Sequence, residues 1–392
     1  MEELLTHLDD DFVIHSTQLP RLSPFPTWNG VVASTTDGRV SLICESGDVV
    51  IFALRRSSAS SPLSLSNASD QVHAQVLSII NSPRKNVMSM CQCWTKDGSH
   101  LVVARDHLVI IYRIQDAQVS VRATLELRVA AASVDVVSDE HGSLNMIIGT
   151  VTGVAIYAVR ALYTEHVHMH TQVTPVLVRI LHPEVPVSVV KASPDHQFVA
   201  IGSVDGRVML LRTQDVLAGV SNAPVYAKVL ASPRVTSITF SPTSSSMVIS
   251  TRKGNVYIVS RSTDGGEWLL DPRYAPLTEN PKLKAGSIST QTLTCWWNST
   301  LDTSRASPVF IIAARSCATE LEMYDTTSSK KMHSLEFKRD PQSSSPLAKA
   351  ADDTHIVGIT CITNDRSVAQ LLCIDSDAHV TLISWPFLEQ YC

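Results

Sequence analysis

Three histidines at alternate positions are the residues most suited to metal binding in this chain: His166, His168 and His170. In an extended segment their imidazoles would share one face, and imidazole is a ligand for Zn, Cu and Ni. The sequence places no Cys or carboxylate nearby at a known ligand spacing, and the segment lies in an insertion between predicted strands. We therefore expect a solvated loop with no metal and no cofactor, and we keep the three histidines as the candidate site if a metal binds.

Residues for covalent catalysis are abundant but do not form a catalytic pattern. Cys91 and Cys93 form a C-x-C pair in a predicted strand, whereas redox motifs place C-x-x-C at the start of a helix. The chain has no Gly-x-Ser-x-Gly elbow and no phosphate-binding glycine loop. We predict no catalytic residues, and we expect both cysteines to pack in the core.

The stretch from Lys191 to Arg212 shows what kind of element must position any site. A Ser193-Pro194 turn precedes an apolar run, and Asp205-Gly206 then separates that run from a second one. Asp-Gly between two apolar runs predicts a β-hairpin, because glycine adopts a positive φ at no steric cost. Similar units recur along the chain, so each unit is expected to bury its faces by stacking on its neighbours.

Seven such units follow one another at about the spacing of propeller blades. The seventh unit has only three strands, and residues 12–17 form an isolated strand that would complete it and remove the open edge. We predict an all-β fold, a single seven-bladed β-propeller over residues 12–388 that is closed by the N-terminal strand. Residues 1–11 would be an acidic tail or short helix, and residues 389–392 a C-terminal tail. The predicted blades span residues 28–80, 87–127, 132–182, 187–231, 234–275, 288–338, and 355–387 with 12–17.

Composition narrows the classes of partner. The chain is 44% hydrophobic, its formal net charge is -5 and its pI is about 6.3, so we expect neither direct nucleic-acid binding nor attraction to an anionic membrane. No apolar run approaches the length of a membrane span, and the acidic N-terminus does not resemble a signal peptide. The eight cysteines lie mostly in apolar runs, which predicts reduced thiols and an intracellular protein of the nucleus, the cytoplasm or both.

The turn chemistry resembles the WD40-repeat β-propeller superfamily. Ser193-Pro194-Asp195 and Ser241-Pro242 match the turn between the first two strands of that repeat, and Asp205-Gly206-Arg207-Val208 matches its second turn. Tyr324-Asp325 stands where the family usually has Trp-Asp. No unit carries Trp-Asp and no Gly-His pair precedes a first strand, so the resemblance implies a divergent propeller without most of the family's buried hydrogen-bond network.

Cations at the turns between second and third strands form the candidate binding surface. In a propeller of this type these turns share one face, and here they carry Arg105, His107, Arg207, Arg252, Lys253 and Arg315. We expect this rim to bind an acidic or phosphorylated segment, the alternative being ordinary solvated turns. Trp296 and Trp297 are adjacent in a predicted strand and must face opposite ways, so one should be core and the other is a candidate interface aromatic.

The sequence thus predicts a non-enzymatic scaffold that binds other protein subunits in an intracellular assembly, its propeller being monomeric. The first expectation is a nuclear-pore or coat-like complex. The alternative is a substrate adaptor of a ubiquitin ligase or a subunit of a transcription or chromatin complex. The alternative from another class is an enzyme that uses the central channel of the propeller. These assignments follow from the resemblance, since fold alone does not determine function.

Overall fold

The computed structural model describes the strands and the shorter connections of the chain. The described residues are 13–18, 31–33, 38–44, 47–56, 72–83, 87, 89–115, 118–139, 143–159, 173–182, 185–231, 234–262, 266–270, 292–298, 309–315, 320–325, 331–336, 356–363, 369–375 and 379–384. They contain one six-residue helix, and every other regular element is a β-strand. None of the described helices is long and apolar enough to span a membrane.

Six blades are antiparallel sheets of four strands that follow one another in the chain. Blade 1 comprises β2 (Val31–Ala33), β3 (Arg39–Ile43), β4 (Val49–Arg56) and β5 (Val72–Ile80). Blade 2 comprises β6 (Met90–Trp94), β7 (His100–Arg105), β8 (Leu108–Gln115) and β9 (Gln118–Glu126). Blade 3 comprises β10 (Ala131–Ser138), β11 (Leu144–Thr150), β12 (Gly153–Val159) and β13 (Val176–Leu181).

The next three blades repeat this strand order. Blade 4 comprises β14 (Val187–Ala192), β15 (Phe198–Ser203), β16 (Arg207–Arg212) and β17 (Tyr226–Val229), with α1 (Thr213–Ala218) between the last two strands. Blade 5 comprises β18 (Val235–Phe240), β19 (Ser246–Thr251), β20 (Val256–Arg261) and β21 (Trp268–Leu270). Blade 6 comprises β22 (Thr292–Asn298), β23 (Val309–Arg315), β24 (Glu320–Asp325) and β25 (Lys331–Glu336).

A composite sheet closes the ring. It joins β26 (Ile356–Thr363), β27 (Ala369–Asp375) and β28 (His379–Ser384) to β1 (Val13–Gln18), in the order β1-β28-β27-β26. The pairing is antiparallel, with Val13 opposite Ser384 and Gln18 opposite His379. The prediction of a seven-bladed propeller is therefore wrong: six blades, not seven, consist of strands consecutive in the chain, and a sheet that joins β1 to the last three strands closes the ring. The reason is physical, since a ring of sheets cannot close without joining its first and last elements.

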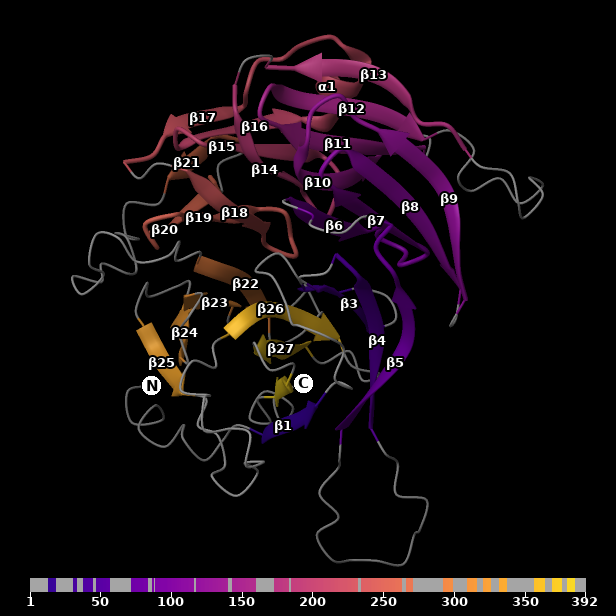
Figure 1. The fold of residues 1–392 in the computed structure, drawn as a ribbon. Helices are drawn as coiled ribbons and strands as arrows, with labels where there is room; N and C mark the ends of the chain where they lie inside the picture. The colour runs from indigo at the N-terminus through magenta and orange to yellow at the C-terminus, as the bar shows by residue number, and fades with distance from the viewer. Residues whose placement is uncertain are drawn as a thin grey trace, which may run out of the picture.

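The first strands of the sheets surround the centre of the ring (Figure 1). They contact one another in the order β2, β6, β10, β14, β18, β22 and β26, and β26 contacts β2 again. Each blade therefore packs its faces against two neighbours, which is what the alternation of apolar residues in short strands requires.

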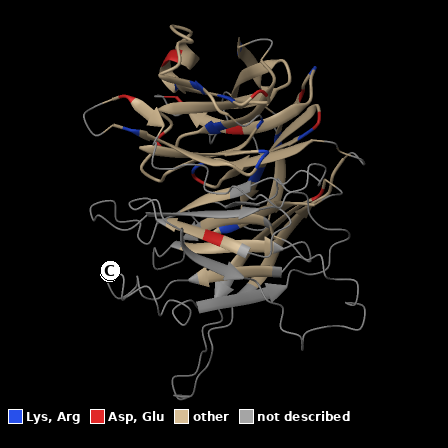
Figure 2. Cartoon of the chain, turned by 90° about the vertical axis from the view of Figure 1, so that its left-hand side faces the viewer, with Lys and Arg blue, Asp and Glu red and all other residues tan. Residues whose placement is uncertain are grey.

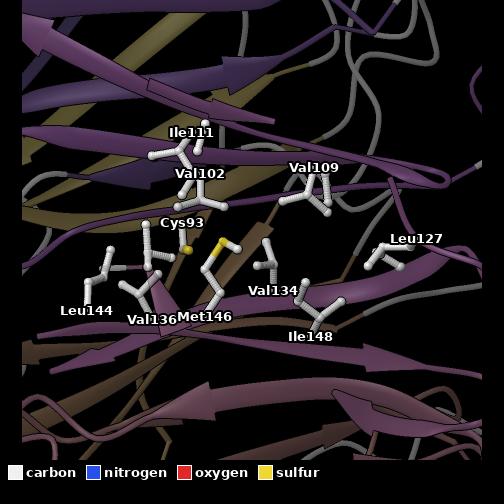
Figure 3. Close-up of a cluster of buried hydrophobic side chains, with 14 residues drawn as sticks. Cys93, Val102, Val109, Ile111, Leu127, Val134, Val136, Leu144, Met146 and Ile148 are labelled. Atoms are coloured by element: carbon white, nitrogen blue, oxygen red, sulfur yellow. The ribbon is translucent and has the colours of Figure 1, made fainter. Parts of the chain in front are cut away.

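The core consists of apolar layers between adjacent blades. Between blades 2 and 3, Val102 and Ile111 from one sheet meet Val136 and Met146 from the other, with Cys93 beside them (Figure 3). Cys93 is thus a core residue, and the pKa of its thiol is raised well above the usual value, mainly by burial. Cys91 packs beside this layer as expected from the sequence.

Connections between third and fourth strands reach back to the preceding blade. Val173, ahead of β13, forms a parallel bridge with Ala123 of β9 and donates its N–H to the carbonyl of Arg122. Helix α1 of blade 4 lies beside β13 of blade 3. Arg179 of β13 donates from Nη1 to the carbonyl of Val216 in α1 at 3.3 Å. These insertions fasten neighbouring blades at their outer strands.

Candidate protein-binding rim

Two kinds of loop meet on one face of the ring. The turn between the second and third strands of a blade lies beside the connection that leads from a fourth strand to the next blade. In blade 4 the N–H of Val204 donates to the carbonyl of Pro186 at 3.0 Å. The carbonyl of Val204 accepts from Arg234 at 2.9 Å, and the carbonyl of Arg234 accepts from Arg252 at 2.9 Å. A chain of backbone hydrogen bonds therefore fixes the loops of blades 4 and 5 side by side.

The turn of blade 4 follows the chemistry predicted for Asp205-Gly206. Gly206 has a φ of +88°, and Ser203 donates from its hydroxyl to the Asp205 carboxylate. The hydrogen bond from Ser203, with the backbone N–H of Arg207 donating at 3.1 Å, lowers the pKa of Asp205. The turn is thus held by its own polar groups, and the Arg207 side chain is left at the surface.

Arg207 forms a long ion pair. Its Nη2 atom lies 3.6 Å from Oδ2 of Asp205, and the two side chains are 45% and 53% exposed. Exposed pairs of this kind are typically worth less than about 1 kcal/mol and exchange readily with other anions. Arg207 therefore remains available to a ligand carboxylate or phosphate.

Three further cations stand beside Arg207. Arg234, Arg252 and Lys253 are exposed, and none of their side chains forms an ion pair or hydrogen bond within the described part of the chain. Arg234 has a φ of +56°, an uncommon conformation for a residue other than glycine, and its two backbone hydrogen bonds hold it there. We call Arg207, Arg234, Arg252 and Lys253 the basic rim.

The basic rim is local. In the view of Figure 2, cations and acids are interspersed over the described strands and turns. The cluster of four cations with one acid, Asp205, at blades 4 and 5 is therefore a feature of these two blades.

Arg105 does not belong to the rim, and its prediction as a surface cation is wrong. Its side chain is 1% exposed because it turns toward the neighbouring blade. Its Nε donates to the carbonyl of Gly47 at 2.8 Å, and Nη1 donates to the hydroxyl of Tyr112 at 3.3 Å. His107 lies in the predicted turn but is half-buried, and the side chain of Arg315 lies outside the described residues.

The aromatic and histidine candidates have different outcomes. Trp296 is buried at 6% exposure, and its Nε1 donates to the carbonyl of Thr239 in the adjacent blade at 2.8 Å, so it is a core residue. The side chain of Trp297 lies outside the described residues, as do His166, His168 and His170. Among the residues that the structure does describe, no group of three or more His, Cys, Asp or Glu is arranged to hold a metal.

The inner strands carry one ion pair that sequence reasoning missed. Lys191 of β14 lies 3.0 Å from Asp135 of β10, and Asp135 also accepts from the N–H of Ala192 at 2.8 Å. Burial opposes the charge of Lys191, but Asp135 outweighs it and raises the pKa of the amine. A protonated amine and the protonated thiol of Cys93 beside it are not poised as base or nucleophile, so the pair joins blades 3 and 4.

Arg234 is the rim residue that the sequence prediction omitted. It lies in the connection between β17 and β18, whereas the sequence prediction covers only turns between second and third strands. The strand order of a blade is the feature that could have identified Arg234. A four-stranded antiparallel blade returns the chain to the face of its second turn before the next blade begins, so cations in both kinds of loop share that face.

One short segment matches a known family. Residues 175–210 match the description "WD domain, G-beta repeat" of the WD40 family. This segment contains the outer strand β13 of blade 3 and the first strands of blade 4, so the repeat in sequence is offset from the blade by one strand. No curated protein matches the chain in sequence.

Solved structures show the same fold at low sequence identity. The β-propeller domain of Cps50 (Swd1) from Myceliophteria thermophila is 9% identical, with a TM-score of 0.59 over 94% of this chain and 98% of that one. A chain of the mitotic checkpoint complex is 15% identical, with a TM-score of 0.56 over 94% of this chain and 90% of that one. In all, 1479 chains match, so the likeness establishes the fold without selecting a function.

The repeat match lies where the turn chemistry resembles WD40 most closely, and the structural likeness extends over nearly the whole chain. The chain therefore has the β-propeller fold, and one segment of it, residues 175–210, matches the WD40 repeat.

Proposed function

We propose that this chain is a non-enzymatic scaffold subunit that holds other proteins in a larger intracellular assembly, and that its basic rim binds an acidic or phosphorylated segment of one partner. The observation that carries the proposal is the backbone-linked cluster of exposed cations at blades 4 and 5. Guanidinium groups pair with carboxylates and phosphates through two parallel hydrogen bonds, which gives both affinity and orientation.

The geometry favours binding because the cations are positioned by the backbone. Val204, Arg234 and Arg252 are joined by successive backbone hydrogen bonds, so the loops need little ordering when a ligand arrives. Only the side chains of Arg234, Arg252 and Lys253 would lose conformational freedom on binding.

The kind of assembly is the finer part of the proposal. We retain a nuclear-pore or coat-like complex as the first expectation, and a ubiquitin-ligase adaptor or a transcription or chromatin subunit as the alternative. Of the two similar structures, one is described as a multiprotein complex, the mitotic checkpoint complex. Cys44, Cys93, Cys295 and Cys373 are buried free thiols, which supports a reducing compartment such as the cytoplasm or nucleus.

Affinity purification with mass spectrometry tests the scaffold role and the rim together. The full chain is compared with Arg207→Glu/Arg252→Glu, and we expect loss of one stoichiometric partner in the double variant. The matched control is Arg212→Glu/Arg261→Glu, since these exposed cations lie at the ends of β16 and β20 that are remote from the rim turns.

The two double variants change net charge equally and differ in the face that carries the substitutions; a thermal unfolding comparison of the control accounts for the contact of Arg261 with the Phe198 ring, 6.0 Å from its centroid. Loss of the partner in both would contradict a specific rim site. Recovery of the wild-type protein with no stoichiometric partner would contradict the scaffold role.

A further inference from the structure

The turns between the second and third strands of blades 2 to 5 carry different types of residue at the same position. The first residue after each second strand is, in blade order, Asp106, Val151, Val204 and Arg252. The rim face thus presents a valine at each of blades 3 and 4, and Val204 of blade 4 is linked through Arg234 to the cations of blade 5.

The two valines are exposed at turn tips. Val151 is 58% exposed and Val204 is 40% exposed. Exposed single valines are ordinary, but turn tips are usually polar, and here two neighbouring blades place the same apolar residue at the same position. The N–H and carbonyl of Val204 are both used, by Pro186 and Arg234, so this residue offers a ligand its side chain alone.

Backbone hydrogen bonds fix the order of Val204, Arg234 and Arg252 across the rim face. The hydrogen bonds from Arg234 to Val204 and from Arg252 to Arg234 step along the face by about 5 Å each, the spacing of hydrogen-bonded chains. Val204 and Arg252 are therefore about 10 Å apart across the rim face. An extended peptide spans this distance with about three residues.

We propose that the rim recognises a two-part segment of a partner protein: an apolar side chain over Val151 and Val204, with carboxylates or a phosphate about three residues away over Arg234, Arg252 and Lys253. This inference rests on the proposed function and specifies its ligand. Charge complementarity supplies the acidic half, and the exposed valines supply a reason for the apolar half.

Asp205 sets the register of this segment. Its carboxylate follows Val204 directly and its pKa is lowered by the hydrogen bond from Ser203, so it is ionised at neutral pH. An acidic ligand residue placed at the valines would meet this like charge, whereas an apolar residue would not. The same ion partly neutralises Arg207, which leaves Arg234, Arg252 and Lys253 as the main anion contacts.

The test uses short labelled peptides and fluorescence anisotropy with the full chain. The first peptide carries one leucine and, three positions later, a run of aspartates in a glycine-serine background. A second peptide replaces the leucine with serine, and a third moves the leucine to a position remote from the acids. A fourth replaces the aspartates with phosphoserine, which distinguishes a phosphate from a carboxylate source.

We expect the first or the fourth peptide to bind, and the second and third to bind about three- to tenfold more weakly, because a surface site would bury only part of the leucine side chain. The double variant Val151→Ser/Val204→Ser should lose the same factor and should no longer distinguish the leucine peptide from the serine peptide. The matched control is Val220→Ser, which removes a 78% exposed valine beyond α1.

Two failures are distinguishable. If Arg234→Glu/Arg252→Glu abolishes binding while the valine variant binds all peptides as the wild type does, the two-part inference is overturned and the basic rim stands. If charge reversal of the arginines leaves peptide binding unchanged, the basic rim itself is overturned.

Discussion

The two faces of the ring use charged residues in different ways. On the rim face, Arg234, Arg252 and Lys253 project from loops that backbone hydrogen bonds hold side by side, and their side chains take no part in those bonds. On the opposite face, which carries the turns between first and second strands, the charged groups are part of the turns themselves. Asp195 accepts from the hydroxyl of Ser193 and from the N–H of Gln197 at 3.0 Å.

The same design recurs in blade 2 on that opposite face. Asp97 accepts from the hydroxyl of Thr95 at 2.6 Å and from the N–H of Ser99 at 3.1 Å. Burial opposes ionisation of Asp97, but the hydrogen bonds from Ser99 and Thr95 outweigh it and lower the pKa. Carboxylates here stabilise turns, so their mutation should reduce stability, whereas mutation of rim cations should change binding.

The largest expected difference between the two faces is the loss of folding stability at acid pH, which we assign to His100. Burial lowers the pKa of His100 to about 4, partly opposed by Asp97 and reinforced by Arg113 and Arg122. The unfolded value is 6.5, so stability is constant above pH 6.5 and falls as the pH drops from 6.5 toward 4, by up to about 3 kcal/mol.

Denaturant unfolding at several pH values measures this contrast. His100→Gln should lose most of that decline, and Arg252→Glu on the rim face should keep it. Because the Gln variant is a core change, an NMR titration of the His100 ring in the wild type provides a second measurement. An imidazole that protonates near its ordinary value would contradict the prediction.

The second-largest expected difference between the two faces is their response to ionic strength. Raising the ionic strength from about 0.05 to 0.3 M shortens the screening length to well below 10 Å, so binding of an acidic peptide at the rim should weaken about tenfold. Unfolding free energy should change little over the same range, because the opposite-face carboxylates are held by short hydrogen bonds to uncharged groups. Salt-independent peptide binding would mean that the cations do not carry the affinity.

A smaller effect is expected from removing one turn carboxylate. Asp195→Ala deletes two hydrogen bonds and should lower the free energy of unfolding by about 1 kcal/mol. Arg252→Ala, an exposed rim change, should stay within about 0.5 kcal/mol of the wild type. Equal losses in the two variants would remove the distinction between the faces.

The smallest effect concerns Asp205, the one acid within the basic rim. Asp205→Asn keeps an oxygen for the turn but removes the charge that partly neutralises Arg207. Affinity for an acidic peptide should rise about twofold, the scale of one exposed ion pair. A decrease in affinity would show that Asp205 contributes to the site.

The all-β propeller architecture could be predicted because its signals are local. Asp205-Gly206 between apolar runs indicates a hairpin from a few residues, and Gly206 has the positive φ that this turn needs. The basic rim could be predicted only in part. Arg207 and Arg252 can be predicted because they lie directly after or within turns between second and third strands, whereas the burial of Arg105 depends on the carbonyl of Gly47 in another blade.

Long-range contacts explain the other omissions. The pair of Asp135 and Lys191 joins residues from different blades, and no spacing rule connects them in the sequence. Trp296 was placed in a strand, but its role in the core follows from a carbonyl acceptor, Thr239, in the preceding blade. Such contacts become visible only when the blades are assembled.

The closing sheet has a consequence for synthesis of the protein. Among the strands of the ring β1 is synthesised first and its partner β28 last, so the ring cannot close before β28 has been made. Until then two strands present unpaired edges, which other chains can pair with. Pairings this remote in sequence form slowly, so closure is the step at which a nascent chain either completes its own ring or donates a strand to a neighbour.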